Sequence, residues 1–224
     1  MKLIDKAKKL PNKTGVYIFL DKNNKPLYIG RATSLRNRVL NYFRTDIEPS
    51  KREMVKKAAK IKHYITDTVL DSVVLEANLI KKYWPKYNIE EKDDKSFIFL
   101  VIPTGDFPKP FTVRGRELKN FPVPAGRVFG PYQSYAALKT VLKIVRRIFP
   151  YSTCRQEGKP CFDYQIGLCP GVCVGVISKK DYQKNIKNLL LLFRGEKVKL
   201  LKKLSKENPE AAIYLKHIQD VTLI

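Results

Sequence analysis

Two tyrosines lie in neighbouring hydrophobic segments near the start of the chain, and arginines follow them. Tyr17 belongs to GVYIFL and Tyr28 to PLYIG, on either side of the polar stretch DKNNK. Arg31 and Arg38 come next in the sequence. A phenol that loses its proton can act as a base, and nearby guanidinium groups favour that charged form. This combination suits phosphodiester hydrolysis, which also needs positive charge around the reacting phosphate.

A single carboxylate in a later apolar segment supplies a further chemical group. Glu76 is the only ionisable residue between Val73 and Ile80. Carboxylate oxygens are ligands that Mg²⁺ prefers, and the cation polarises a phosphate. The chain has only two histidines, so a histidine-based metal site is not expected. The alternative is that Glu76 forms an ordinary salt bridge and that the tyrosines only fill the core.

A hairpin and a helix must position the tyrosines and arginines. Hydrophobic alternation predicts strands over residues 14–20 and 27–30, joined by a polar turn. Because alternate residues of a strand share a face, an antiparallel hairpin can place both tyrosines on one face. A helix is expected over residues 32–45, with Thr33 or Ser34 as N-cap. Arg38 and Tyr42 are four residues apart there and should be neighbours.

The remaining elements follow from periodicity and from helix-stop signals. The helix carrying Glu76 should begin near Asp71 or Ser72 and end before Pro85. We further expect a basic helix over 48–64, a strand over 63–70, a strand over 96–103, a loop over 105–131, a helix over 134–149, and Lys/Leu-rich helices near the end.

The charge of the chain indicates a polyanionic partner. It has 44 Lys+Arg against 21 Asp+Glu, a formal net charge of +23. Such an excess is typical of nucleic-acid binding, although a generally basic thermophilic or ribosome-associated protein is the alternative. No apolar run approaches a membrane span and no signal peptide is visible, so a cytoplasmic protein is expected. Phosphate contacts are predicted on the basic helix at Lys51, Arg52, Lys56, Lys57, Lys60 and Lys62.

Several ordered motifs resemble a known family. GVY followed by YIG resembles the signature of the GIY-YIG nucleases, and RATSLRNRVLNYF resembles their next helix. VLEANLIKKYWPKYN is similar to their glutamate helix and following asparagine. Together with RVFGPYQSYAALKTVLKIVRRIFPYSTC and CFDYQIGLCPGVCVGVISKKDY, they narrow the resemblance to the UvrC family of bacterial nucleotide excision repair. The resemblance extends from about Leu10 to about Gly195.

The resemblance implies an α+β fold. It consists of a GIY-YIG domain, with a small three-stranded antiparallel sheet flanked by helices, followed by a mostly helical cysteine-containing region. The implied domains are 1–100 for the nuclease, 101–150 for a connecting α/β region, and 151–224 for the cysteine-rich region and helical tail. The tail faintly resembles a shortened UvrB-binding hairpin. The second nuclease of longer relatives is absent from this sequence.

The resemblance also implies an endonuclease that makes the 3′ incision beside a lesion in double-stranded DNA. Its implied cofactor is Mg²⁺ or Mn²⁺, and its implied partner is UvrB in the UvrA–UvrB–DNA complex. The implied site comprises Tyr17 and Tyr28, one of them the base, Arg31 and Arg38 for phosphate charge, Tyr42 for orientation, Glu76 for the metal, Asn88 for support, and Gly15 and Gly30 for close backbone approach. The other functions considered are a stand-alone GIY-YIG nuclease of a mobile element and an inactive DNA-binding scaffold.

All four cysteines lie within one short segment, at Cys154, Cys161, Cys169 and Cys173. Their spacing is neither a standard zinc finger nor a standard ferredoxin run. Four clustered thiolates can hold Zn²⁺ or a [4Fe–4S] cluster, and the family resemblance favours the iron–sulfur cluster. The alternative is four reduced thiols without a metal. Oligomeric state and lesion range are left open by the sequence.

Overall fold

The computed structural model describes residues 2–90, 97–155 and 158–217. It divides into two compact units. The first contains the residues up to Phe97, and the second is Ile98–Leu215. Each unit has its own three-stranded antiparallel sheet and its own buried residues, so each is described separately.

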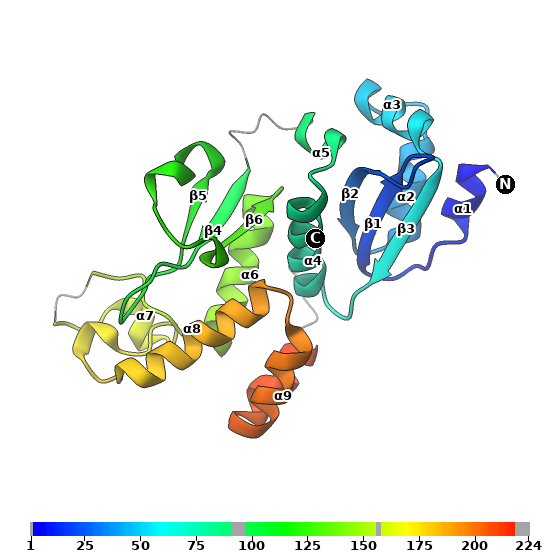
Figure 1. The fold of residues 1–224 in the computed structure, drawn as a ribbon. Helices are drawn as coiled ribbons and strands as arrows, with labels where there is room; N and C mark the ends of the chain where they lie inside the picture. Colours follow the sequence, from blue (N-terminus) through cyan, green and yellow to red (C-terminus); the bar gives the residue numbers. More distant parts are fainter. Residues whose placement is uncertain (1, 91–96, 156–157, 218–224) are drawn as a thin grey trace. The chain divides into compact units, whose positions relative to one another are not determined.

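The first unit contains a sheet with strand order β2-β1-β3 (Figure 1). Its strands are β1 (Gly15–Leu20), β2 (Pro26–Ala32) and β3 (Lys60–Ile65). Tyr17 is paired with Gly30 and Phe19 with Tyr28, so these four residues share one face. The predicted hairpin, with both tyrosines on the same face, is therefore confirmed.

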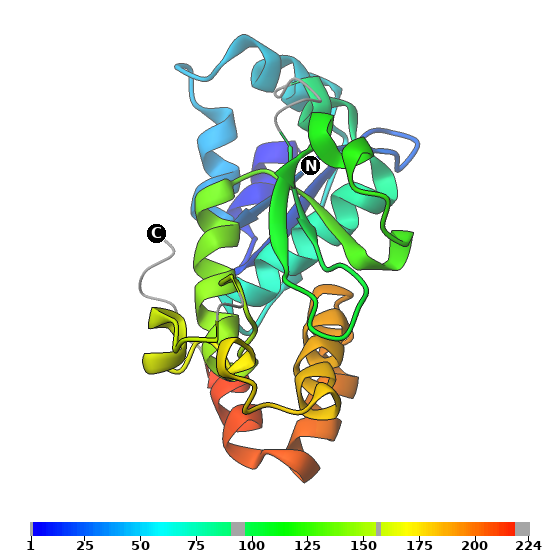
Figure 2. The ribbon, with the colours of Figure 1, turned by 90° about the vertical axis from the view of Figure 1, so that its left-hand side faces the viewer.

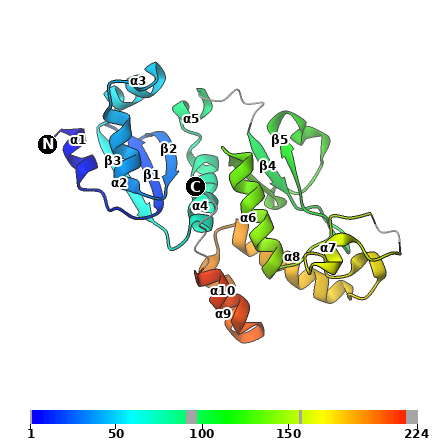
Figure 3. The same cartoon turned by 180° about the vertical axis from the view of Figure 1, so that it is seen from behind.

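Helices cover both faces of this sheet (Figures 1 and 3). On the tyrosine face, α2 (Leu35–Leu40) contributes buried Leu35 and Val39 to the core, and the short turn η1 (Asn41–Phe43) follows it. On the opposite face, Ile80 of α4 (Val69–Tyr83) packs with the aliphatic residues of the strands. The unit also contains α1 (Leu3–Lys8), α3 (Pro49–Lys57) and α5 (Lys86–Glu90).

Three predicted boundaries in the first unit were wrong. The basic helix ends at Lys57, and Lys60 and Lys62 belong to β3, so the third strand begins earlier than the sequence pattern indicated. Helix α4 begins at Val69 and is capped by Thr68. The hydroxyl of Thr68 accepts from the backbone N–H of Asp71, and the carboxylate of Asp71 accepts from the Thr68 N–H, a reciprocal capping box.

The second unit contains a sheet that the sequence did not predict in full. Its order is β5-β4-β6, formed by β4 (Ile98–Val101), β5 (Phe111–Arg114) and β6 (Val128–Tyr132). Only the first of these strands was expected. The segment predicted as a loop also contains the 3₁₀ turns η3 (Gly115–Asn120) and η4 (Ala125–Arg127).

The rest of the second unit is mainly helical. The cysteine segment lies beside the C-terminal half of α6 (Tyr135–Ile148), as Figure 2 shows. Further along the chain, α9 (Lys197–Glu207) and α10 (Pro209–His217) form a helical hairpin (Figure 3). None of the helices within residues 2–90, 97–155 and 158–217 is long and apolar enough to cross a membrane. The elements are α6 (Tyr135–Ile148), α7 (Phe162–Gln165), η5 (Val172–Val174), α8 (Lys179–Phe193), α9 (Lys197–Glu207) and α10 (Pro209–His217).

Candidate active site

Three tyrosines form a compact cluster on one face of the first sheet. Tyr17 and Tyr42 are joined by a hydrogen bond of 2.7 Å between their hydroxyl oxygens. The ring of Tyr28 has its centroid 6.3 Å from that of Tyr17 and 5.9 Å from that of Tyr42. All three side chains are at most 4% exposed. Strands β1 and β2 and the turn η1 therefore bring three phenol groups together.

Gly30 provides the space that the Tyr17 ring occupies. A Cβ atom added at Gly30 would lie 2.5 Å from the Tyr17 hydroxyl oxygen, which is far inside van der Waals contact. The absence of a side chain therefore lets the ring lie over β2 and reach Tyr42. At Gly15, by contrast, an added Cβ would meet the backbone carbonyl of Tyr64 on β3. Gly15 therefore permits close packing of two strands.

Arg38 adds a positive charge to the tyrosine cluster. Its guanidinium carbon lies 5.7 Å from the centroid of the Tyr42 ring, as their four-residue spacing predicted. Burial raises the pKa of Tyr17 well above 10.0, with a further contribution from Tyr42, while the charge of Arg38 acts in the opposite direction. The pKa of Arg38 is raised, chiefly by Tyr17. Among the described groups, Arg38 thus favours the phenolate form that burial disfavours.

Arg31 and Glu76 form a separate ion pair. Arg31 Nε lies 3.4 Å from Glu76 Oε2, and the Glu76 side chain is only 9% exposed. In the β1–β2 register Arg31 is opposite Val16, on the face that packs against α4. The sequence suggested Arg31 as a charge beside the tyrosines, but the structure places it against the carboxylate instead.

Strand β2 links these two groups of residues. Gly30 faces the tyrosine cluster, and Arg31, the next residue, faces Glu76. Because successive residues of a strand face opposite sides of the sheet, these two positions are only about 3.8 Å apart along the backbone. The carboxylate of Glu76 suits a hard divalent cation, and among the described contacts it is paired with Arg31, on the face of the sheet opposite the phenols.

Asn88 of α5 fixes the backbone of β2 between the two groups. Its side-chain oxygen accepts from the N–H of Ile29 at 2.8 Å, and its side-chain nitrogen donates to the carbonyl of Ile29 at 2.7 Å. Asn88 is 2% exposed. The amide therefore pairs with the strand edge as a neighbouring peptide group would. It holds the residues that flank Ile29, namely Tyr28 and Gly30.

A surface hollow borders the tyrosine cluster. Its volume is about 210 Å³, and Arg38 and Tyr42 form part of its wall. Lys51 contributes a second cation, which is paired with Glu48 at 3.0 Å. The hollow thus connects a buried phenol to solvent beside two positive charges. The remaining lining residues, Asn41, Ile47 and Glu48, carry no distinctive sequence signal, and the sequence did not single them out.

The other predicted phosphate-contacting cations are on two elements rather than one. Arg52, Lys56 and Lys57 are exposed on α3. Lys60 is exposed on β3, where its ammonium group donates to the Asn24 side chain at 2.7 Å. Lys57 is paired with Glu53, and Arg52 donates to the carbonyl of Thr45 at 2.8 Å. Part of the basic surface is therefore held by local contacts.

The four cysteines of the second unit converge on one point. Their Sγ atoms all lie within 4.8 Å of one another, although the residues come from separate turns. Cys169 and Cys173 are buried, and Cys154 and Cys161 are half-buried. Gly171, with φ of 93°, lets the chain turn sharply before Cys173. The four thiols thus form a single four-sulfur cluster.

This four-sulfur cluster fits a metal centre by its chemistry. A backbone hydrogen bond from Cys161 lowers the pKa of the Cys173 thiol, which favours the thiolate that binds metals, whereas burial raises the pKa of the Cys161 thiol to about 12. The Sγ atoms of Cys161 and Cys173 lie 3.6 Å apart. A tetrahedral Zn²⁺ with Zn–S bonds of about 2.3 Å requires sulfur separations of about 3.8 Å. A four-iron cluster binds each thiolate to a different iron and therefore requires a wider arrangement.

Two family models match the chain. A UvrC-like GIY-YIG domain matches residues 13–89, and the middle domain of the UvrC/Cho excinucleases matches residues 97–192. A UvrABC system protein C from Moorella thermoacetica is 38% identical over 95% of this chain and 35% of its own length. One from Carboxydothermus hydrogenoformans is 39% identical over 92% of this chain and 34% of its own. The chain spans about a third of the length of these curated relatives.

Solved structures similar to the chain cover its first part. The GIY-YIG N-terminal endonuclease domain of UvrC from Thermotoga maritima, bound to magnesium as its catalytic divalent cation, is 38% identical. That likeness covers 39% of this chain and 96% of the solved one, with a TM-score of 0.37. A point mutant of the same domain with a tyrosine replaced by phenylalanine, also bound to its catalytic divalent cation, gives 37% identity. Its likeness covers 39% of this chain and 96% of the solved one, again with a TM-score of 0.37.

Proposed function

The chain belongs to the UvrC family and its first unit is a GIY-YIG endonuclease domain, and from this premise we propose that it hydrolyses one phosphodiester bond of lesion-bearing DNA. The proposed cut is the incision on the 3′ side of the lesion, made with a divalent cation in a complex with UvrA and UvrB. The observation that supports the proposal best is the hydrogen-bonded pair of Tyr17 and Tyr42 beside Arg38.

The residues divide the proposed reaction between them. Water attacks phosphorus and gives its proton to the phenolate form of the tyrosine pair, while the bond to the leaving strand oxygen breaks and that oxygen takes a proton from solvent. Arg38 stabilises both the phenolate and the charge that develops on the phosphate. Tyr42 connects the surface hollow to Tyr17, so it provides the path by which a proton reaches the buried phenol. Asn88 keeps β2, and hence Tyr28, in place.

Glu76 is the residue that we propose binds the divalent cation. The cation would act there as a Lewis acid that polarises the phosphate. The guanidinium group of Arg31, in β2, adds a positive charge beside the Glu76 carboxylate and orients it. The basic surface of α3, with Lys51, Arg52, Lys56 and Lys57, together with Lys60 of β3, would contact phosphates of the duplex without reading its sequence.

Cleavage of a lesion-bearing duplex by the chain with UvrA, UvrB and Mg²⁺ tests this function. Tyr17→Phe, Tyr28→Phe and Glu76→Ala should be compared with Tyr83→Phe, a matched variant at an exposed tyrosine of α4. Loss of the base or of the metal ligand should lower the cleavage rate by at least ~10²-fold, whereas Tyr83→Phe should cut normally. Labelling each end of the damaged strand shows on which side of the lesion the cut falls.

Three results would contradict the proposal. Equal cutting by all four variants would remove the proposed site. A cut only on the 5′ side would remove the assignment of the incision. Binding of DNA without any cleavage by the unaltered chain would favour an inactive scaffold.

The four-sulfur cluster supports a second metal centre in the same chain, and we propose the [4Fe–4S] cluster that the family resemblance implies. Its binding requires the sulfur atoms to move apart from their present separations. Iron and acid-labile sulfide measured on anaerobically purified protein should each approach four per chain. One zinc ion per chain and no iron would instead match the present sulfur spacing and contradict the iron–sulfur assignment.

A further inference from the structure

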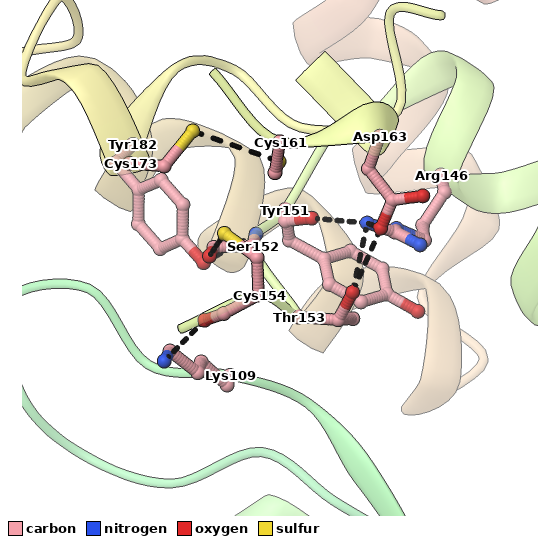
Figure 4. A network of polar contacts seen from close by, with 10 residues as sticks. All are labelled: Lys109, Arg146, Tyr151, Ser152, Thr153, Cys154, Cys161, Asp163, Cys173 and Tyr182. Atoms are coloured by element: carbon pink, nitrogen blue, oxygen red, sulfur yellow. Dashed lines mark hydrogen bonds and ion pairs between the residues drawn. The ribbon is translucent and has the colours of Figure 1, made fainter. Parts of the chain in front are cut away.

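A half-buried arginine lies next to the four-sulfur cluster without an assigned role. Arg146 is near the end of α6, and its side chain is 13% exposed. Its guanidinium carbon stacks 4.8 Å from the centroid of the Tyr151 ring. The next residue, Arg147, is exposed, so two adjacent arginines have opposite environments. Figure 4 shows the Arg146 guanidinium directed at the segments that carry the cysteines.

One nitrogen of Arg146 lies within hydrogen-bond distance of three oxygen acceptors. Arg146 Nη2 donates to the carbonyl of Tyr151 at 2.9 Å, to the carboxylate of Asp163 at 2.8 Å and to the hydroxyl of Thr153 at 3.3 Å. Thr153 in turn donates to the same carboxylate oxygen of Asp163 at 2.8 Å. The charge and hydrogen bond of Arg146 lower the pKa of Asp163. The contacts form one closed polar network (Figure 4).

Two members of this network are within two residues of a cysteine in the sequence. Thr153 directly precedes Cys154, and Asp163 follows Cys161 by two residues. The carbonyl of Asp163 also accepts from the backbone N–H of Cys169 at 2.9 Å. Arg146 therefore fixes the segments of three of the four cysteines relative to α6.

Helix α6 is a suitable support for this network. Its residues Leu138, Val141 and Val145 are fully buried, so the helix is anchored in the core of its unit. A partly buried ion pair adds little net stability, because the charges lose hydration when they are buried. Arg146 Nε also lacks a hydrogen-bond partner among the described residues. An arginine at this position is thus better explained by the geometry that it imposes than by stability alone.

We propose that Arg146 is a positioning residue for the metal centre, which holds three of the four thiol-bearing segments in place before the metal binds. This inference rests on the metal centre proposed above. Ligand-supporting contacts of this kind typically change metal affinity by about 10- to 100-fold when they are removed. The effect is exerted through Asp163, Thr153 and the Tyr151 carbonyl, because Arg146 itself contacts no sulfur atom in any described interaction.

The test compares Arg146→Met with Arg147→Met, two variants that lose the same charge at adjacent positions. Co²⁺ alone is added to the reduced, metal-free chain, and the cobalt–thiolate absorption gives the dissociation constant. Arg146→Met should bind Co²⁺ about 10- to 100-fold more weakly than the unaltered chain, and Arg147→Met should bind it unchanged. Arg146→Lys keeps the charge and one donor group, so its Co²⁺ affinity should lie between those of Arg146→Met and the unaltered chain.

A double variant separates positioning from general damage to the fold. If Arg146 acts through Asp163, the double variant Arg146→Met/Asp163→Asn should bind Co²⁺ no more weakly than Arg146→Met alone, because both changes break the same network. Equal affinity of Arg146→Met and the unaltered chain would overturn the inference and leave the metal centre intact. If Arg146→Met fails to fold by circular dichroism, Arg146→Lys decides: normal Co²⁺ affinity in that variant would overturn the inference. Failure of the unaltered chain to bind Co²⁺, together with the absence of iron from the anaerobically purified protein, would overturn the metal centre itself.

Discussion

At the scale of single residues, the site depends on how tightly the phenols are enclosed. Tyr17 is 1% exposed and its hydroxyl meets Tyr42 over the backbone of Gly30. Burial, with a further contribution from Tyr42, holds the pKa of Tyr17 well above 10.0, and Arg38 is the group that opposes this shift. The catalytic role that we propose for the cluster therefore depends on the arrangement of these four residues.

Substitution of Gly30 tests that arrangement directly. In Gly30→Ala the new methyl group would overlap the Tyr17 hydroxyl and push the ring away from Tyr42. Overpacking of this kind typically costs about 1–3 kcal/mol of unfolding free energy, and cleavage should fall with it. Urea denaturation and the cleavage assay measure both effects. Gly126→Ala is the control, since its added methyl group would only touch the end of the Arg194 side chain; equal stability of the two variants would contradict the tight contact at Gly30.

The tyrosine cluster was predictable from the sequence, but the ion pair was not. Alternation along β1 and β2 places Tyr17 and Tyr28 on one face, and the four-residue spacing of Arg38 and Tyr42 makes them neighbours. No spacing links Arg31 to Glu76, because their contact depends on how α4 packs across the sheet. The convergence of the four cysteines was expected from their clustering in the sequence and is confirmed, although their separations are set by tertiary structure.

At the scale of the elements, α4 is positioned by its first turn. The capping box between Thr68 and Asp71 begins the helix, and Glu76 follows within the next two turns. The sequence contained the Thr68 and Asp71 of this capping box, but the β-branched residues before Asp71 favoured the prediction of a strand there. Similarly, Lys60 and Lys62 extend a helical pattern that pairing with β1 overrides. Such boundaries are set by tertiary pairing rather than by local preference.

Removal of the α4 cap gives a prediction at this scale. Thr68→Ala loses the acceptor for the Asp71 N–H and should lower the unfolding free energy by about 1 kcal/mol. Chemical denaturation measures this change. Ser205→Ala, at an exposed position inside α9, should leave stability unchanged or slightly higher, because alanine is the stronger helix former. A Thr68→Ala protein as stable as the unaltered chain would show that the capping box does not determine where α4 begins.

At the scale of the whole molecule, both units bury tyrosines whose pKa values are raised. Burial raises the pKa of Tyr151 and of Tyr182 to about 12, and it also raises the pKa of Tyr17 and of Tyr132. The folded chain therefore retains phenolic protons that an unfolded chain loses near pH ~10. Because the folded state then binds more protons than the unfolded state, stability must fall as pH rises above that value.

The expected result is a loss of stability confined to alkaline solution. The contribution of these tyrosines to the unfolding free energy should be constant below pH ~10 and should decrease as the pH rises from there toward their folded pKa values. Thermal unfolding followed by circular dichroism across this range measures it. Tyr164→Phe, which removes an exposed phenol, is the control and should follow the unaltered chain. An unfolding temperature that stays level through the alkaline range would contradict the burial of these phenols.

The side chain of Asn88 has a consequence for the solution behaviour of the first unit. β2 is an edge strand of its sheet, and the Asn88 side chain occupies the backbone N–H and carbonyl of Ile29 in that strand. These two groups are therefore not open to pairing with another strand. Exposed sheet edges recruit strands from other molecules and lead to aggregation. The amide that fixes the backbone beside Tyr28 and Gly30 therefore also leaves less of the sheet edge open to strands from other molecules.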